Sequence, residues 1–171
     1  SSSSSTGAGG SGQGGMGGMG GGSACGDTMT DPMNCGACGN PCAPGQTCET
    51  GKCTCAAGAT ATMADVQAIF SKSCGSAGNC HNKANPSAGL SLMPGNSHGS
   101  LVNVDTNSCG DGRKRVLPGE PSESYIIDKV MNKQLCKLGN GMNSQKMPPG
   151  STLPMADIET IANWICAGAP Q

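Results

Sequence analysis

Hydrophobic residues recur with helical spacing in three stretches of the chain, all of them after residue 60. The first stretch has four such residues at positions i, i+3, i+4 and i+8: Val66, Ile69, Phe70 and Cys74. This spacing places them on one face of a helix. Thr62 precedes the stretch and Asp65 follows it three residues later, which is the capping-box pattern that begins a helix. We therefore expect a helix that begins after Thr62 and ends near Cys74.

Two further helices are predicted toward the C-terminus. One begins near Pro121 and carries apolar residues between Tyr125 and Met131. The other follows Pro154 and ends before Gly168. Its apolar stripe consists of Ile158, Ile161, Ala162 and Ile165. The loops between the predicted helices are long and rich in Gly, Pro and Asn, and loops of this length usually surround a ligand or serve a function.

The N-terminal residues show no hydrophobic pattern. Residues 1–23 begin with five serines, and 11 of the first 22 residues are Gly. Such a segment cannot bury enough apolar surface to offset its backbone entropy, so we expect a flexible Gly/Ser-rich tether. Two interpretations stay open: the tether leads to a lipid anchor upstream of Ser1, as in a surface lipoprotein, or it is a solvated terminus.

The chain has 12 Cys, and seven of them lie in residues 24–58 among Gly, Pro and Asn. These residues form turns but no hydrophobic core, so we expect a module in which disulfides replace the core. Cys35 and Cys38 have the spacing of zinc ligands, but neither a second such pair nor a His accompanies them, and zinc is the weaker interpretation. Disulfides form in oxidising compartments, which predicts an extracytoplasmic location, either periplasmic or at the cell surface.

Charge and hydropathy exclude two classes of partner. The net charge is −1, so there is no basic field to hold a nucleic acid. No run of 18 apolar residues occurs, so no membrane span is predicted. With 35% hydrophobic residues, a single core for all 171 residues is not expected. We expect one modest packed domain over residues 62–170, which contain all the aromatic residues and both His.

The segment after the first predicted helix carries the main chemical signal. Five residues separate Cys74 from Cys80, and His81 follows directly. In c-type haem attachment, two thiols add across vinyl groups of the porphyrin, and the His after the second Cys becomes an iron ligand. The usual gap between the two Cys is two residues. A small disulfide loop beside a coincidental His therefore stays open as the other interpretation.

A second axial ligand is available in the loop before the last predicted helix. Met147 precedes Pro148 and Pro149, which restrict the backbone directly after it. Ligation by His and Met suits an electron carrier whose iron has no open coordination site. Met142 is an alternative ligand in the same loop.

The motifs of the C-terminal part occur in a characteristic order: Cys74…Cys80-His81, Pro86-Ser87-Ala88-Gly89-Leu90, Arg115-Val116-Leu117-Pro118-Gly119, Met147-Pro148-Pro149 and Trp164-Ile165…Gly168-Ala169-Pro170. Nearly all of residues 62–170 thereby resemble the cytochrome c-like domain of planctomycetes and myxobacteria. The resemblance implies an all-α cytochrome c fold with long loops and one haem c, covalently bound through Cys74 and Cys80. It also implies the axial ligands His81 and Met147, and a Pro86 carbonyl that bonds the second ring nitrogen of His81.

The Cys-rich residues 24–58 resemble a short repeat of exported myxobacterial proteins, which implies a structural or spacer module. We therefore expect an exported monohaem c-type cytochrome that exchanges electrons with a redox partner protein and is not an enzyme. Nine residues are expected to surround its haem: Val66, Ile69, Phe70, Leu90, Leu92, Tyr125, Ile161, Trp164 and Ile165. The alternative is a haem-free, disulfide-stapled surface lipoprotein with a structural or binding role. Peroxidase-like catalysis would need an open iron site in place of Met147.

Three smaller features complete the sequence-based expectations. Cys109 and Cys136 are expected to form a disulfide, and Cys166 is left to bridge the two modules. The charged residues 113–115 form a solvated patch by default, while docking of an acidic redox partner or contact with a haem propionate are the other interpretations. His98 is expected to be an exposed loop residue rather than a ligand.

Overall fold

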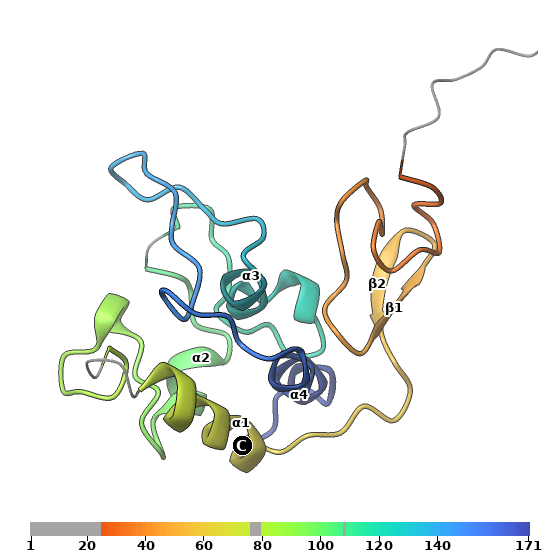
Figure 1. Cartoon of the computed structure of the whole chain (residues 1–171). Helices are drawn as coiled ribbons and strands as arrows, with labels where there is room; N and C mark the ends of the chain where they lie inside the picture. The colour runs from red at the N-terminus through yellow and green to blue at the C-terminus, as the bar shows by residue number, and fades with distance from the viewer. Residues whose placement is uncertain (1–24, 76–79, 108) are drawn as a thin grey trace, which may run out of the picture.

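The computed structural model describes residues 25–75, 80–107 and 109–171 (Figure 1). The elements in chain order are β1 (Gln46–Glu49), β2 (Lys52–Cys55), α1 (Met63–Ile69), a π-helical turn (Phe70–Cys74), a 3₁₀ turn (Ser87–Gly89), α2 (Ser97–Leu101), a second 3₁₀ turn (Pro121–Glu123), α3 (Tyr125–Met131) and α4 (Met155–Cys166). The predicted tether, residues 1–23, lies outside the described residues.

The prediction of an all-α cytochrome c-like fold is wrong. Helices account for about 30% of the described residues, and among these helices only α4 exceeds seven residues. The remainder consists of loops, a two-stranded antiparallel sheet and five disulfides. The physical reason lies in the glycines. Thirteen described Gly residues have positive φ, a conformation that ends helices and builds turns.

The three predicted helices are confirmed within this irregular fold, although they are short. The Thr62 hydroxyl accepts a hydrogen bond from the Asp65 amide (3.3 Å), and the Asp65 carboxylate accepts one from the Thr62 amide (2.8 Å). This capping box begins α1, which continues into the π-helical turn. Helix α3 ends at Asn132, whose left-handed φ of 56° stops it, and α4 follows Pro154 as expected.

Helix α4 packs against both α1 and α3. These helices contribute most of the large, fully buried side chains of the C-terminal core: Val66, Phe70, Ile127, Ile158, Ile161, Trp164 and Ile165. The Trp164 indole N–H donates to the carbonyl of Pro170 (2.8 Å), which holds the chain end against α4. Phe70 and Ile161 belong to this core and also line the pocket described below, so the core forms the back of that pocket.

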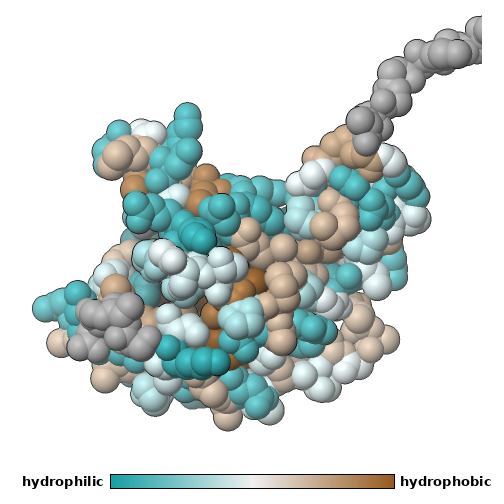
Figure 2. Space-filling view, viewed as in Figure 1, coloured by the Kyte–Doolittle hydropathy of each residue, from teal (hydrophilic) through white to brown (hydrophobic). Residues whose placement is uncertain are grey.

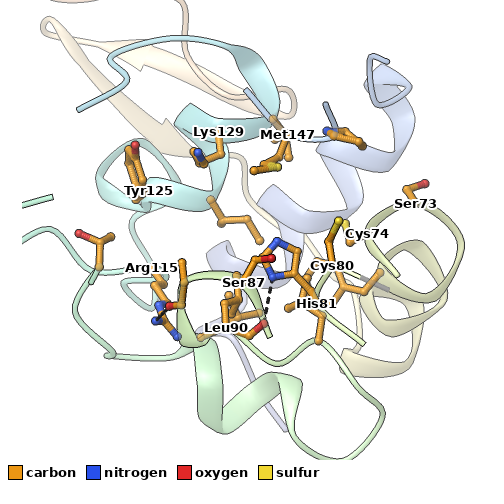
Figure 3. A pocket seen from close by; sticks show the side chains of 18 of the residues that line it. Ser73, Cys74, Cys80, His81, Ser87, Leu90, Arg115, Tyr125, Lys129 and Met147 are labelled. Carbon is orange, nitrogen blue, oxygen red and sulfur yellow. Dashed lines mark hydrogen bonds between the residues drawn. The ribbon is translucent and has the colours of Figure 1, made fainter. Parts of the chain in front are cut away.

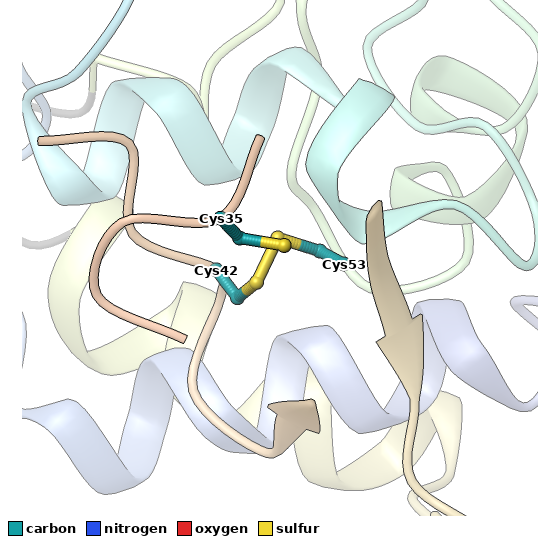
Figure 4. Close-up of side chains that lie close together, drawn as sticks. All are labelled: Cys35, Cys42 and Cys53. Atoms are coloured by element: carbon teal, nitrogen blue, oxygen red, sulfur yellow. A yellow bond between two sulfur atoms is a disulfide. The ribbon is translucent and has the colours of Figure 1, made fainter. Parts of the chain in front are cut away.

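The N-terminal part is a disulfide-stapled module built around the β1–β2 hairpin, whose strands have only four residues each. The hairpin turns at Thr50 and Gly51, whose φ angles of 51° and 77° suit a tight two-residue turn. Its disulfides are Cys25–Cys38, Cys35–Cys48 and Cys42–Cys53. The sulfurs of Cys35, Cys42 and Cys53 lie within 4.8 Å of one another (Figure 4). All three belong to disulfides. The zinc interpretation, which rested on Cys35 and Cys38, is wrong because these two cysteines also form disulfides, with Cys48 and Cys25.

One disulfide and several hydrogen bonds hold this module on the C-terminal part. The Cys55–Cys166 disulfide joins β2 to α4, which confirms the expected bridge between the modules. The Ser122 hydroxyl donates to the side-chain oxygen of Gln46 (2.9 Å), and Ala43 is buried in the C-terminal core. In Figure 1 the module lies on one side of α4, and the loops that follow α1 lie on the other.

The predicted Cys109–Cys136 disulfide is also confirmed. Five disulfides in one small chain indicate an extracytoplasmic or otherwise oxidising environment. Within the described ranges, no helix combines the length and the apolar character needed to cross a membrane.

Candidate functional site

A pocket lies between the end of the α1 region, the loop from residue 80 to 92, α3, and the loop before α4 (Figure 3). Its volume is about 170 Å³, and it opens to solvent at a recess in which hydrophobic atoms are visible (Figure 2). The apolar side chains that line it are Phe70, Leu90, Leu92, Leu101, Ile126, Val130, Pro148, Pro149 and Ile161. Walls of this kind suit a ligand with a large apolar surface and a few polar anchors.

His81 is the buried polar anchor of this pocket, with 8% of its surface exposed. Its Nδ1 lies 3.0 Å from the carbonyl oxygen of Leu90. Since a carbonyl can only accept, Nδ1 carries the proton and donates it, and Nε2 keeps its lone pair. Figure 3 shows this second nitrogen directed into the pocket. Burial lowers the pKa of His81, so the ring stays neutral, which is the form that binds a metal ion.

Cys74 and Cys80 lie next to His81 on one side of the pocket (Figure 3). Cys74 ends the π-helical turn and belongs to no disulfide, and Cys80 directly precedes His81. Burial raises the pKa of the Cys74 thiol to about 11, so this side chain is protonated at neutral pH. A protonated thiol argues against an activated nucleophile, because the thiolate is the reactive species in such sites.

Met147 lies on the opposite side of the pocket from His81 (Figure 3). Its backbone amide donates to the carbonyl of Lys129 on α3 (2.8 Å). The Lys129 ammonium donates to the Ser144 hydroxyl (2.6 Å) and to the carbonyl of Gln145. These three hydrogen bonds, which we call the Lys129 strap, hold the segment with Met147 on α3 and thereby position its thioether over the pocket.

The pocket is positively charged. Its lining includes Arg115 and Lys129, and none of the described lining residues is Asp or Glu. Burial lowers the pKa of both cations. Arg115 is only 7% exposed, so the expectation of a solvated patch at residues 113–115 is wrong for it. Its neighbours Arg113 and Lys114 instead form salt bridges outside the pocket lining.

Two candidate site residues do not lie where the sequence placed them. The carbonyl that accepts from His81 belongs to Leu90 and not to Pro86. The Pro86 carbonyl accepts from the Gly89 amide (3.0 Å) because it closes the 3₁₀ turn, and Pro86 does not line the pocket. Met142, the alternative to Met147, is 62% exposed and also lies outside the lining.

Five of the nine residues expected to surround the ligand line the pocket: Phe70, Leu90, Leu92, Tyr125 and Ile161. The other four lie in the core behind it: Val66, Ile69, Trp164 and Ile165. His98 is not an exposed loop residue. It is half-buried on α2, and its Nε2 bonds the carbonyl of Ala169 (3.0 Å), which gives it a structural role.

Lys129, Ser144 and the carbonyl of Leu90 belong to the site but were not predicted from the sequence. One signal was present for Lys129. It stands three residues after Ile126 and one before Val130, so it shares the apolar face of α3, and all three residues line the pocket. A lysine on such a face needs a polar partner, which here is the segment before Met147.

The donor set of this pocket fits a haem. An imidazole and a thioether lie on opposite sides, two cysteines lie at one edge, and the walls are apolar (Figure 3). Since the pocket opens to solvent, it also accommodates a ligand that extends beyond the enclosed 170 Å³. Comparisons with protein-family models, with curated proteins and with solved structures give no match for this chain.

Proposed function

We propose that the pocket holds one haem through thioether bonds to Cys74 and Cys80, with His81 and Met147 as axial ligands, and that the protein is an electron carrier. The observation that supports this proposal is the convergence of these four side chains on one apolar pocket, although 73 positions separate the first from the last. When bound, a haem supplies a one-electron iron couple.

The surrounding residues have defined tasks in this function. The hydrogen bond from His81 to the Leu90 carbonyl orients the imidazole and increases its basicity. Met147 would supply a soft thioether ligand to the iron and would leave no open site for substrate, which favours electron transfer over catalysis. The apolar walls exclude water and disfavour the additional charge of the ferric state.

The proposal extends to location and partner. Beyond the oxidising environment that the disulfides indicate, we place the protein in the periplasm or at the cell surface. Residues 1–23 would then act as its tether, attached through a lipid anchor upstream of Ser1. The open side of the pocket is the surface on which a redox partner protein would exchange electrons.

Covalent attachment is tested by expressing the chain together with haem-attachment machinery and then denaturing and reducing it. We expect the visible absorption of haem to remain on the denatured wild-type chain and to be lost in a Cys74→Ala/Cys80→Ala double variant. Ser73→Ala is the control, because Ser73 lines the same pocket but has no thiol. A colourless wild-type chain in which all 12 cysteines are alkylated after reduction, and not only the ten other than Cys74 and Cys80, would reject the proposal in favour of a haem-free, disulfide-stapled surface lipoprotein.

The sixth ligand is tested by a pair of methionine variants. Met147→Leu should convert the six-coordinate low-spin spectrum of the haem-loaded protein into a five-coordinate one. Met142→Leu should leave the spectrum unchanged, because this side chain is 62% exposed and lies outside the pocket. A low-spin spectrum in both variants would reject Met147 as the ligand.

A further inference from the structure

We propose that the side of the pocket opposite the two cysteines is a carboxylate-binding site built on Arg115. Under the function proposed above, on which this identification of the ligand rests, the carboxylates are the propionate groups of the haem. More generally, the site recognises an amphipathic ligand that has an apolar body and a carboxylate end.

The first argument is the environment of the Arg115 charge. Arg115 is 7% exposed, and in the described part of the chain no carboxylate forms a salt bridge with its guanidinium. A buried charge without a counter-charge is costly, and it is retained where an anion compensates it. Its two neighbours behave differently. Arg113 pairs with Asp111 and Asp128, and Lys114 pairs with Asp105.

The second argument is the number of hydrogen-bond donors. Arg115 donates through Nη1 to the carbonyls of Ser100 (2.8 Å) and Gly89 (3.3 Å), and through Nη2 to the carbonyl of Ala88 (3.0 Å). A guanidinium has five N–H donors, so two are left after these three bonds. The carbonyls fix the plane of the group without neutralising it. A charged guanidinium with a fixed orientation and two remaining N–H donors is suited to bind a carboxylate.

The third argument is the distribution of polarity around the pocket. The cysteines lie on one side, while Arg115 and Tyr125 lie on the other (Figure 3). Asn107 lines the pocket beside Arg115, because its side-chain amide donates to the carbonyl of Ala88 (3.2 Å), which also accepts from Arg115. A ligand in this pocket therefore meets the two thiols on one side and a cationic group with polar neighbours on the other. This difference between the two sides sets the orientation in which an amphipathic anion binds, with its carboxylate toward Arg115.

The test compares ligands before it compares variants. The full chain without haem is titrated with iron mesoporphyrin, which lacks the vinyl groups needed for thioether formation, and with its dimethyl ester. Quenching of Trp164, the single tryptophan, reports binding. We expect the diacid to bind at least about tenfold more tightly than the diester, as charge-assisted hydrogen bonds imply. Since both ligands bind the same folded protein, this comparison does not depend on how well a variant folds.

Variants then assign the preference to Arg115. Arg115→Met should abolish the preference for the diacid, and Arg115→Lys should keep part of it. Lys114→Met is the matched control. It removes the same charge from the adjacent position, outside the pocket lining, and should leave the preference intact. If Arg115→Met does not fold, the comparison of diacid and diester on the wild-type chain decides.

The outcomes separate this inference from the proposed function. Equal binding of diacid and diester overturns the carboxylate site and leaves the haem pocket in place. If neither porphyrin binds but laurate does, in a manner abolished by Arg115→Met, the carboxylate site stands and the haem function fails. If porphyrins and laurate all fail to bind, both proposals are overturned.

Discussion

Replacing Lys129 by Met tests how the protein keeps Met147 over the pocket. The substitution removes the ammonium but retains an apolar side chain of similar length on α3. Two bonds of the Lys129 strap are lost, those to Ser144 and Gln145, and only the backbone bond between the Met147 amide and the Lys129 carbonyl remains. The segment with Met147 should therefore open more often.

The size of this effect follows from the two bonds that are lost. A hydrogen bond to a charged group contributes about 1.5–3 kcal/mol to stability. Lys129 is half-buried, and water replaces part of each bond, so we take about 1 kcal/mol for each. The total of about 2 kcal/mol corresponds to a shift of about 30-fold between the closed and the open segment.

Two measurements report this shift. In the chain without haem, hydrogen exchange of the Met147 amide should become about 30-fold faster, since its acceptor is the Lys129 carbonyl. In the haem-loaded protein, external imidazole should bind ferric iron more tightly by a similar factor, because Met147 must leave before imidazole can bind. The control is Lys133→Met. Lys133 donates to the Pro41 carbonyl (2.8 Å), away from the pocket.

The reasoning is refuted if exchange of the Met147 amide does not change in Lys129→Met. It is also refuted if Lys133→Met accelerates that exchange equally, since the effect would then report a general loosening of α3. If exchange of the Met147 amide becomes faster but imidazole does not bind more tightly, the Lys129 strap holds this segment on α3 as described, but Met147 is not the iron ligand.

Three further predictions concern stability. The Cys55→Ser/Cys166→Ser double variant should lose about 4–5 kcal/mol in denaturant unfolding, because the bond closes a loop over a sequence separation of 111, and a loss under about 1 kcal/mol would contradict this. Burial raises the pKa of Asp128 from 3.8 to about 6, so its contribution to stability is present below pH 3.8 and is lost as the pH rises through 6. Asp128→Asn should therefore be on the order of 2 kcal/mol more stable than the wild type at pH 7 and equal to it at pH 3, and parallel pH profiles of stability would exclude this. Gly36→Ala would place a Cβ 2.6 Å from a backbone carbonyl of the hairpin turn, so thermal melting should show a larger loss than in Gly39→Ala, where φ is also positive but no atom lies within 4 Å.

The helices could be predicted from the sequence because their signals are local. Thr62 and Asp65 cap α1 within four residues, and Pro154 marks the start of α4. The fold class could not be predicted in the same way. Most of the chain follows a path set by positive-φ glycines and by long-range links such as Cys55–Cys166, and spacing alone does not reveal which cysteines pair. The hairpin strands show no hydrophobic alternation in the sequence, because a polar residue, Gln46, occupies a buried position of β1.

In the candidate site, four residues that act through side chains could be predicted from the sequence, and the group that acts through the backbone could not. Cys74, Cys80, His81 and Met147 could be named from the sequence because their side chains carry the chemistry, and the structure brings all four to one pocket. The partner of His81 could not, because it is the backbone carbonyl of Leu90, a group that every residue possesses. Hydrogen bonds to the backbone depend on how the chain turns, and the identity of the residue does not reveal them.

The Cys55–Cys166 bond also changes how the molecule would respond to mechanical load. A pull applied between residue 25 and Gln171 travels through the cross-linked hairpin module, crosses directly from Cys55 to Cys166 and leaves by the final residues. The intervening stretch contains every residue that lines the pocket, and it lies outside this line of tension. A protein held by its N-terminal end would thus bear tension without deformation of the pocket, as long as the Cys55–Cys166 disulfide is not reduced.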